Sequence, residues 1–548
     1  MAILEKRIKG HSYFYEVHGY RENGKVKQSI VRYFGRVDPR KNPDAKPVVK
    51  KELVSTYRFG DAALLYVAAQ RINMFDVVNR YVPKRQGLPL SLELFLTVAH
   101  KLLGDEPSST NLQHWVRTTH LPLLLNFSPE HITDNTQQYL MGKLYNEERN
   151  IDHLYRISIE LYQNALKLFG KEDDTYFYDI TSTYFEGKCC PIAFFGHNKD
   201  GKLDKLQINI AMIMNGKYGI PVVSKVFEGN VNDAKTVYGM VYYPKMVMKK
   251  EKCLLIMDRG FDSEDNVRLM DTVEYDYVIG LRSTHKFVKK LKAETDLSTG
   301  SWETIERDGD EIKLRKVVKN LFGKRRIVIL YYSPKVAREQ KARRDFRMEN
   351  AIERLKSYGE FAPGRKLTVK KAEEIIRSVN RYIAIGQNGG MVMWNVDKVA
   401  VNRAERNDGK FCIMTNKDIS PKDVFALYFS KDKIEKGFRH MKQDAHLRPI
   451  YKRLADHVIV DVFLCHVAYL LMRVVEHLAQ QEKIDKFWNV LSSEAHVVSL
   501  VELRDRRTSN TEFQVVTNNQ IQKDIVDKIG LQRQMPVSTT NAKMSSKT

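Results

Sequence analysis

A short apolar run closed by a carboxylate is the feature that most constrains the fold of this chain. Residues 253–258 read Cys-Leu-Leu-Ile-Met-Asp and are followed by Arg259. An unbroken apolar run of this length is typical of a strand buried on both faces, as in the parallel sheets of α/β proteins. Because such sheets bind ligands beyond the carboxyl ends of their strands, we expect Asp258 to lie at a functional edge.

A second predicted strand, residues 175–185, carries Asp179 in its middle, among aromatic and β-branched residues. Aspartate is unfavourable inside strands, so its presence there needs a reason. Taken alone, either aspartate is explained as a capping or turn residue. The two together with Glu435, described next, favour a shared site.

The third segment runs from Ser420 to Lys442 and is predicted to be one helix, with Ser420 as N-cap and Pro421 in the first turn. Five of its residues recur at steps of three and four and therefore share one face: Tyr428, Lys431, Glu435, Phe438 and Lys442. A face with a phenol, two cations and a carboxylate suits an anionic ligand and a metal ion. The alternative is a solvated face in which Lys431 pairs with Glu435.

With these motifs the chain resembles the DDE transposases of bacterial and archaeal insertion sequences, in the branch that has a Tyr-Arg-Glu-Lys signature. The resemblance covers roughly residues 171–477, and its most specific part is the motif Tyr-x2-Lys-x3-Glu-x6-Lys, in which several residue types fall at fixed spacing. It implies that Asp179, Asp258 and Glu435 are the catalytic acidic triad.

The signature departs from the family pattern at Lys431, where the family has arginine. Lysine keeps the charge but loses the planar fork that binds a phosphate through two hydrogen bonds. The residues expected to contact DNA are Tyr428, Lys431, Arg439, Lys442, Arg259 and Arg282.

The implied chemistry is the cleavage and transfer of a phosphodiester, for which two divalent ions about 3.5–4 Å apart activate the attacking oxygen and stabilise the leaving one. We expect Mg²⁺ or Mn²⁺, since hard cations prefer carboxylate oxygens. Asp179 would bridge both ions, and Asp258 and Glu435 would each hold one.

The charge of the chain favours a polyanionic partner independently of these motifs. Its 90 Lys and Arg outnumber 67 Asp and Glu, giving +23; a ribosome-associated factor would share this property. The absence of a Walker A loop and of a His-Glu-x-x-His motif disfavours ATP-driven remodelling and zinc hydrolysis. Five cysteines without zinc spacing suit a reducing cytosol, so we expect a cytoplasmic protein. The apolar residues 458–475 include two charged residues and are interpreted as a core helix, with no membrane partner.

The predicted fold class is α/β, with an RNase H-like catalytic domain interrupted by a largely β insertion and preceded by a β-hairpin unit and a helical domain. The expected order in the first half of that domain is three strands, helix, strand, helix, strand. The predicted divisions are a small β unit with a hairpin turn at 23–24 (1–50), a helical domain that binds DNA ends by analogy (51–170), the first catalytic half (171–282), a basic insertion (283–408), the second catalytic half with the glutamate helix (409–480), and a C-terminal region with a disordered tail (481–548).

Within the insertion, residues 313–347 hold 13 Lys or Arg against two acids, which predicts a DNA-backbone surface; the alternative is a solvated basic helix face. The expected function is cleavage at insertion-sequence ends and strand transfer into target DNA by a homodimer in a synaptic complex. Two alternatives stay open: an RNase H-like nuclease without strand transfer, and a non-catalytic, transposase-derived DNA-binding regulator.

Overall fold

The computed structural model describes residues 2–538 apart from 23–24, 46–50, 85, 106, 172–173, 188, 197–200, 203, 247–251, 359–365 and 507–509. The predicted turn at 23–24 and most of the predicted disordered tail therefore lie outside the described residues.

A nine-stranded mixed sheet organises the centre of the molecule, in the order β12-β13-β14-β17-β11-β10-β7-β8-β9. Strands β7, β8 and β9 pair antiparallel, β10 is parallel to both β7 and β11, and β17 is antiparallel to β11. The elements of the first half are β7 (Thr175–Tyr184), β8 (Gln207–Asn215), β9 (Pro221–Glu228), α8 (Asp233–Thr236), α9 (Tyr238–Met246), β10 (Leu254–Met257), α10 (Glu264–Thr272) and β11 (Asp276–Leu281).

This order confirms the predicted sequence of three strands, helix, strand, helix, strand, with the first helix divided into α8 and α9. The apolar run ending at Asp258 forms β10, whose four residues are all buried. Strand β8 is buried along its whole length. Continuous burial explains why neither strand shows the apolar–polar alternation of a half-exposed sheet.

The insertion is less β-rich than predicted. Its strands β12 (Glu303–Arg307), β13 (Asp310–Leu321) and β14 (Lys324–Tyr332) exist, but β14 pairs with β17 (Lys410–Thr415) and so extends the central sheet. The rest forms a mainly helical lobe with its own small core. Its elements are α11 (Lys286–Glu294), α12 (Pro334–Lys356), α14 (Val369–Ile376), a hairpin of β15 (Ile383–Asn388) and β16 (Met391–Val396), and α15 (Lys398–Asn407).

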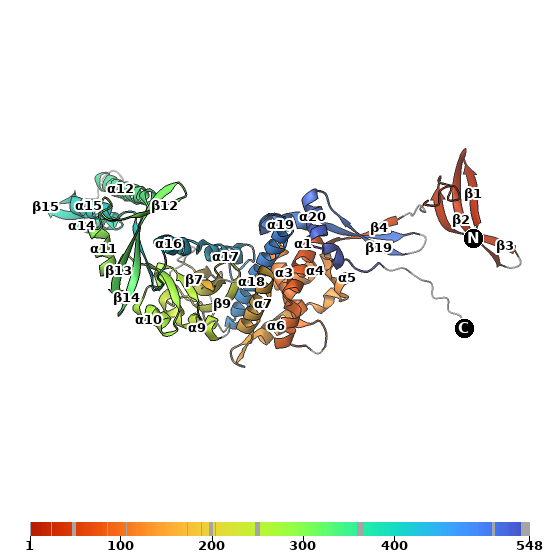
Figure 1. Cartoon of the computed structure of the whole chain (residues 1–548), viewed down its shortest axis with the longest axis horizontal. Coiled ribbons are helices and arrows are strands. Elements are labelled where there is room, and N and C mark those ends of the chain that lie inside the picture. Colours follow the sequence, from red (N-terminus) through yellow and green to blue (C-terminus); the bar gives the residue numbers. More distant parts are fainter. Residues whose placement is uncertain are drawn as a thin grey trace.

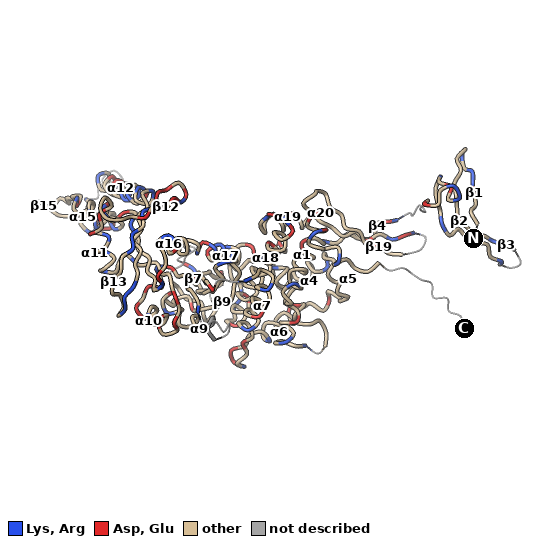
Figure 2. The backbone as a smooth tube through the Cα atoms, in the orientation of Figure 1, with Lys and Arg blue, Asp and Glu red and all other residues tan. Residues whose placement is uncertain are grey.

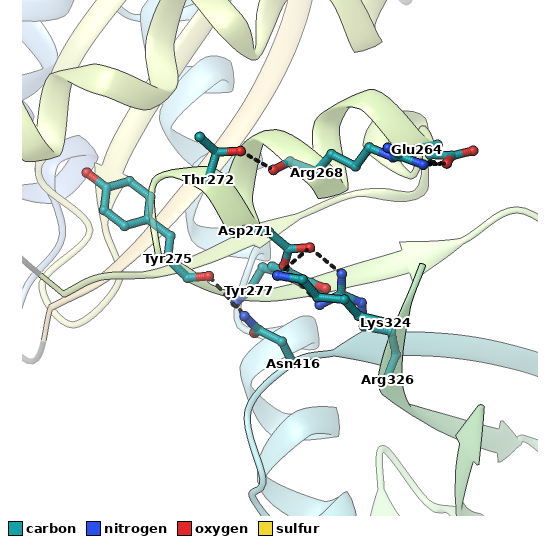
Figure 3. Close-up of polar contacts among 9 residues, drawn as sticks. All are labelled: Glu264, Arg268, Asp271, Thr272, Tyr275, Tyr277, Lys324, Arg326 and Asn416. Atoms are coloured by element: carbon teal, nitrogen blue, oxygen red, sulfur yellow. Dashed lines mark hydrogen bonds and ion pairs between the residues drawn. The ribbon is translucent and has the colours of Figure 1, made fainter. Parts of the chain in front are cut away.

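The inserted strands are fastened to the first catalytic half at helix α10 (Figure 3). Arg326 of β14, only 3% exposed, donates to both carboxylate oxygens of Asp271 on α10, one at 2.9 Å. The amide of Asn416 accepts from the Tyr277 N–H at 2.9 Å and donates to the Tyr275 carbonyl at 3.0 Å. A buried guanidinium needs such a paired carboxylate, so Arg326 serves the fold and is not part of the predicted DNA surface.

The helical part lies beyond the β9 end of the sheet, toward the opposite end of the body from the insertion lobe (Figure 1). Its elements are α1 (Gly60–Arg71), α2 (Met74–Tyr81), α3 (Leu90–Leu103), α4 (Ser109–Thr118), α5 (Leu121–Leu125), α6 (Asp134–Leu144) and α7 (Leu154–Phe169), with a two-strand ribbon of β5 (Tyr145–Asn146) and β6 (Ile151–Asp152). Residues 51–58, which we predicted to begin the helical pattern, instead form β4 (Lys51–Arg58), because they pair with a strand near the other end of the chain.

That partner belongs to the C-terminal elements, which are α19 (Trp488–His496), β18 (Ser499–Asp505), β19 (Thr511–Val516) and α20 (Gln520–Lys528). At the N-terminus, β1 (Ala2–Ile8), β2 (His11–Glu22) and β3 (Lys25–Gly35) form the predicted small antiparallel sheet, which stands apart from the body in Figure 1.

One long helix, α18 (Ala455–Gln481), links the helical part to the sheet, contacting α1, α3, α7 and β9. By length and composition it is the one helix among the described residues that is apolar enough to cross a membrane, but 89% of its most apolar window is buried inside the protein. The prediction of a buried core helix over 458–475 is confirmed.

Candidate active site

The three predicted acids are carried by three adjacent elements. Asp179 lies in the middle of β7, and Asp258 follows directly after β10. Because Met257 is in register with Tyr178 in the parallel pair, Asp258 and Asp179 come from neighbouring positions of neighbouring strands. Glu435 lies in the first turn of α17 (Asp432–Gln443), which packs on β7. All three line one cleft of about 410 Å³.

The segment Ser420–Lys442 is two helices and not the single helix that we predicted. Ser420 caps α16 (Pro421–Phe429) by accepting from the Asp423 N–H at 3.1 Å, as expected. The helix ends at Ser430, whose hydroxyl donates to the Leu427 carbonyl at 2.7 Å. Such a side-chain bond to the backbone competes with helical hydrogen bonding. A second helix, α17, then begins at Asp432, with Lys431 at its N-cap position.

The break leaves Tyr428 and Lys431 on the same carboxylate. The Tyr428 hydroxyl donates to Asp258 Oδ1 at 2.8 Å, and Lys431 Nζ lies 3.2 Å from the same oxygen. Lys431 Nζ is also 3.4 Å from Glu435 Oε1. Both signature residues therefore contact Asp258, one of the three predicted acids, where we expected contacts to a phosphate.

Gly280 of β11 makes room for this arrangement. A Cβ atom at this position would lie 2.3 Å from the Tyr428 hydroxyl and 2.9 Å from its Cζ. A glycine inside an apolar strand is the sequence signal of such a close approach, and we had not used it. Gly280 therefore positions the phenol over Asp258.

Electrostatically, all three acids act on the Lys431 ammonium. Burial lowers the pKa of Lys431, but the negative charges of Asp258, Asp179 and Glu435 outweigh burial and raise it above its ordinary value. Burial likewise raises the pKa of the Asp258 carboxyl, but the charge of Lys431 and hydrogen bonds from the Arg259 N–H and Tyr428 bring it below its usual value of 3.8. The site holds a lysine cation among three carboxylates.

The predicted DNA-contacting arginines and Lys442 are divided among three places. Arg439 and Lys442 line the same cleft as the acids, together with Arg448, which was not among the residues predicted to contact DNA. Arg259 is exposed and lines a different groove. Arg282 does not line the cleft and binds the carboxylate of Asp262.

Asp262 is fully buried and binds the residues that follow β11. It accepts from the Arg282 N–H at 2.6 Å, from Arg282 Nε at 2.5 Å, and lies 2.7 Å from His285 Nε2. Its neighbour Ser263 caps α10 instead, by accepting from the Asn266 N–H at 3.3 Å. Asp262 thus ties the loop that carries Asp258 to the end of β11.

The donor set suits a hard divalent cation, because carboxylate oxygens are its preferred ligands and a cation of the chain already lies among them. Within the described residues, however, no three His, Cys, Asp or Glu side chains are close enough together to hold one ion in common. The three acids surround the Lys431 ammonium instead. Displacement of that ammonium would expose the oxygens that a metal ion needs.

The sequence of residues 185–471, more than half of the chain, matches the family model described as a transposase DDE domain. No curated protein matches the chain at the level of sequence. Among solved structures, the chain is similar to a piggyBac transposase in a synaptic complex with hairpin DNA, with 8% identity and a TM-score of 0.38 over 81% of this chain and 82% of that one. Enzymes of the matched family generally use divalent metal ions. The chain belongs to the family of DDE-domain transposases, and it is an enzyme of DNA transposition that cleaves and transfers DNA strands.

Proposed function

We propose that the chain is an insertion-sequence transposase of the Tyr-Arg-Glu-Lys branch, whose catalytic acids are Asp179, Asp258 and Glu435. The observation that carries this proposal is that the three acids, far apart in sequence, line one cleft and act on one cation. The strand order β9-β8-β7-β10-β11, with β10 and β11 parallel to β7, supports an RNase H-like catalytic domain.

The proposed cofactors are two Mg²⁺ or Mn²⁺ ions, held by the three carboxylates. When bound, they supply activation of the attacking oxygen and stabilisation of the leaving oxygen. The protein's own groups have separate tasks. Arg439, Lys442 and Arg448 line the cleft as cations and would bind the phosphates on either side of the scissile bond.

Tyr428 and Lys431 orient Asp258 before DNA binds. We expect the Lys431 ammonium to transfer to a DNA phosphate once the carboxylates bind metal, since both partners are then satisfied. The proposed reaction is cleavage at the ends of the element and joining of the freed 3′-hydroxyl to target DNA. The proposed assembly is a homodimer that synapses two ends in the cytoplasm, with the helical residues 60–169 contacting the ends.

Substitution of Asp258 by Asn tests the proposal with an isosteric loss of one charged ligand. With Mg²⁺ and a labelled duplex that carries the terminal repeat flanking the gene, Asp258→Asn should abolish strand cleavage while DNA binding stays close to wild type. Asp432→Asn is the matched control. Asp432 lies in the first turn of α17, as Glu435 does, but it pairs with Lys436 at 3.1 Å outside the cleft. Cleavage by Asp258→Asn at the wild-type rate would refute the assignment.

The alternatives are separated by a pre-cut end with a free 3′-hydroxyl. A transposase joins this end to a second duplex in the presence of Mg²⁺. A nuclease without strand transfer would cleave the intact end but never join the pre-cut one. A DNA-binding regulator would bind both DNAs and show no chemistry.

A further inference from the structure

A basic groove of about 950 Å³ lies between helices α11 and α15, next to the active site. Five exposed cations line it: Arg259, Lys289, Lys290, Arg381 and Arg403. Figure 1 shows α11 and α15 together at the insertion end of the molecule, and Figure 2 shows Lys and Arg gathered around these elements. None of the five belongs to residues 313–347, for which we predicted DNA contact.

The positive charge of the groove is not neutralised by its own acids. Asp397 accepts from the Ala400 N–H at 2.9 Å as the cap of α15, and Asp408 pairs with the buried Arg344 at 2.7 Å. Within the described part of the chain, the cations Lys289, Arg381 and Arg403 have no carboxylate within 4 Å. Lys290 has only the exposed Glu294, at 3.8 Å.

The floor of the groove adds two buried ammonium groups, on Lys292 and Lys410, which are 6% and 5% exposed. Lys292 donates to Ser283 Oγ at 2.8 Å, and Lys410 donates to the carbonyls of Lys292 and Thr295 at 3.0 and 2.6 Å. These partners are neutral oxygens. Burial lowers the pKa of both lysines. The negative charges of Asp408 and Asp296 act on Lys292 and Lys410 without an ion pair within 4 Å in the described part of the chain, so an anion bound in the groove would offset part of the cost of burying these cations.

Arg259 connects the groove to the active site. It follows Asp258 directly in the chain, and its charge acts both on Lys292 in the groove floor and on Tyr428 beside Asp258. A DNA strand with its scissile phosphate at Asp258 can therefore continue past Arg259 into the groove.

We propose that the groove between α11 and α15 binds the phosphodiester backbone of duplex DNA that extends from the active-site cleft. This inference rests on the proposed function, since it assigns a second part of the same substrate. A groove lined by several exposed cations suits a polyanion, and release of condensed counter-ions supplies the affinity.

The test is the salt dependence of DNA binding in EDTA, where no cleavage occurs. The groove variant combines Lys289→Gln, Arg381→Gln and Arg403→Gln. The control variant combines Arg354→Gln, Lys356→Gln and Lys370→Gln, which removes the same charge from exposed positions of the same lobe outside the groove. The probe is a fluorescein-labelled 30-base-pair duplex of random sequence, titrated by anisotropy at several KCl concentrations.

Each phosphate contact contributes a slope of about −0.9 to log K against log salt. The groove variant should therefore flatten the slope by about 2.7, while the control should change it by less than about 1. Equal slopes for the two variants, on this duplex and also on the terminal-repeat probe described below, would overturn the proposal. If the triple variant does not fold, Arg403→Gln alone should flatten the slope by about 0.9, and no change would again refute it.

A second probe carrying the element's terminal repeat identifies the DNA. A response confined to that probe assigns the groove to element DNA, whereas an equal response with the random duplex assigns it to target DNA. The outcome is distinguishable from failure of the proposed function. Groove-dependent binding without any Mg²⁺-dependent joining would refute the function alone, and joining without groove-dependent binding would refute the groove alone.

Discussion

Replacing Lys431 by Met should make the DNA-free protein bind divalent metal more tightly. The Lys431 ammonium lies 3.2 Å from Asp258 Oδ1 and 3.4 Å from Glu435 Oε1. A divalent ion held by these acids needs the same oxygens, so the ammonium and the ion compete. Methionine keeps the unbranched length of the side chain and removes only the competing charge.

The magnitude follows from the two ion pairs. The side chains are 20% exposed for Lys431, 36% for Asp258 and 55% for Glu435, so solvent screens both pairs. Screened pairs contribute about 0.2–1 kcal/mol each. Because Asp258 is the less exposed partner, we take about 1–2 kcal/mol for the sum, which corresponds to a 5- to 30-fold gain in metal affinity.

Isothermal titration with Mn²⁺ in the absence of DNA measures this gain, and a metal-dependent rise of the thermal unfolding midpoint supplies a second readout. Lys436→Met is the control, because Lys436 lies on the same helix and pairs with Asp432 at 3.1 Å, outside the cleft. Wild-type or weaker Mn²⁺ affinity in Lys431→Met would contradict the competition, as would an equal gain in Lys436→Met.

Two further predictions concern the supports of the site. Gly280→Ala should lower the free energy of unfolding by about 1–3 kcal/mol, because the added Cβ would overlap the Tyr428 ring. This loss should be smaller in a Tyr428→Phe background. Additive effects of the two substitutions in thermal unfolding would argue against the contact. Arg326→Met should lower the free energy of unfolding by about 3–5 kcal/mol, because among the described residues the carboxylate of Asp271 would keep only the exposed Lys324 at 3.4 Å as an ion-pair partner. The double variant with Asp271→Leu should recover most of this loss in denaturant unfolding. No recovery would mean that the broken pair is not the cause of the loss.

The local features of the fold could be predicted from the sequence because their causes are local. The strand ending at Asp258 follows from its unbroken apolar run, and the cap at Ser420 follows from hydroxyl, proline and spacing. The pairing of β14 with β17 could not be predicted, because the two strands are separated by the whole outer lobe and nothing in either strand specifies its partner. The same holds for β4 and β18, at opposite ends of the chain.

Within the site, the residue types were predictable and their contacts were not. Periodicity places Tyr428 and Glu435 on one face of a continuous helix, but the hydroxyl of Ser430 ends that helix between them. Adjacent polar residues also compete for one role: Ser263 caps α10 and leaves Asp262 to bind Arg282, and the sequence does not say which of the two does so.

The substitution of lysine for arginine in the signature acquires a meaning from these contacts. An arginine fork fits two oxygens of one planar group, whereas the point charge of Lys431 can be shared between Asp258 and Glu435, which come from different elements. A shared ammonium holds the three acids near one another without the repulsion that three carboxylates alone would produce. The flexible side chain of Lys431 also allows the ammonium to move away when a divalent cation binds. We therefore expect Lys431→Arg, which keeps the charge, to bind Mn²⁺ no more tightly than wild type. A gain in affinity equal to that of Lys431→Met would show that the positive charge of residue 431 is not the cause of the competition with the metal ion.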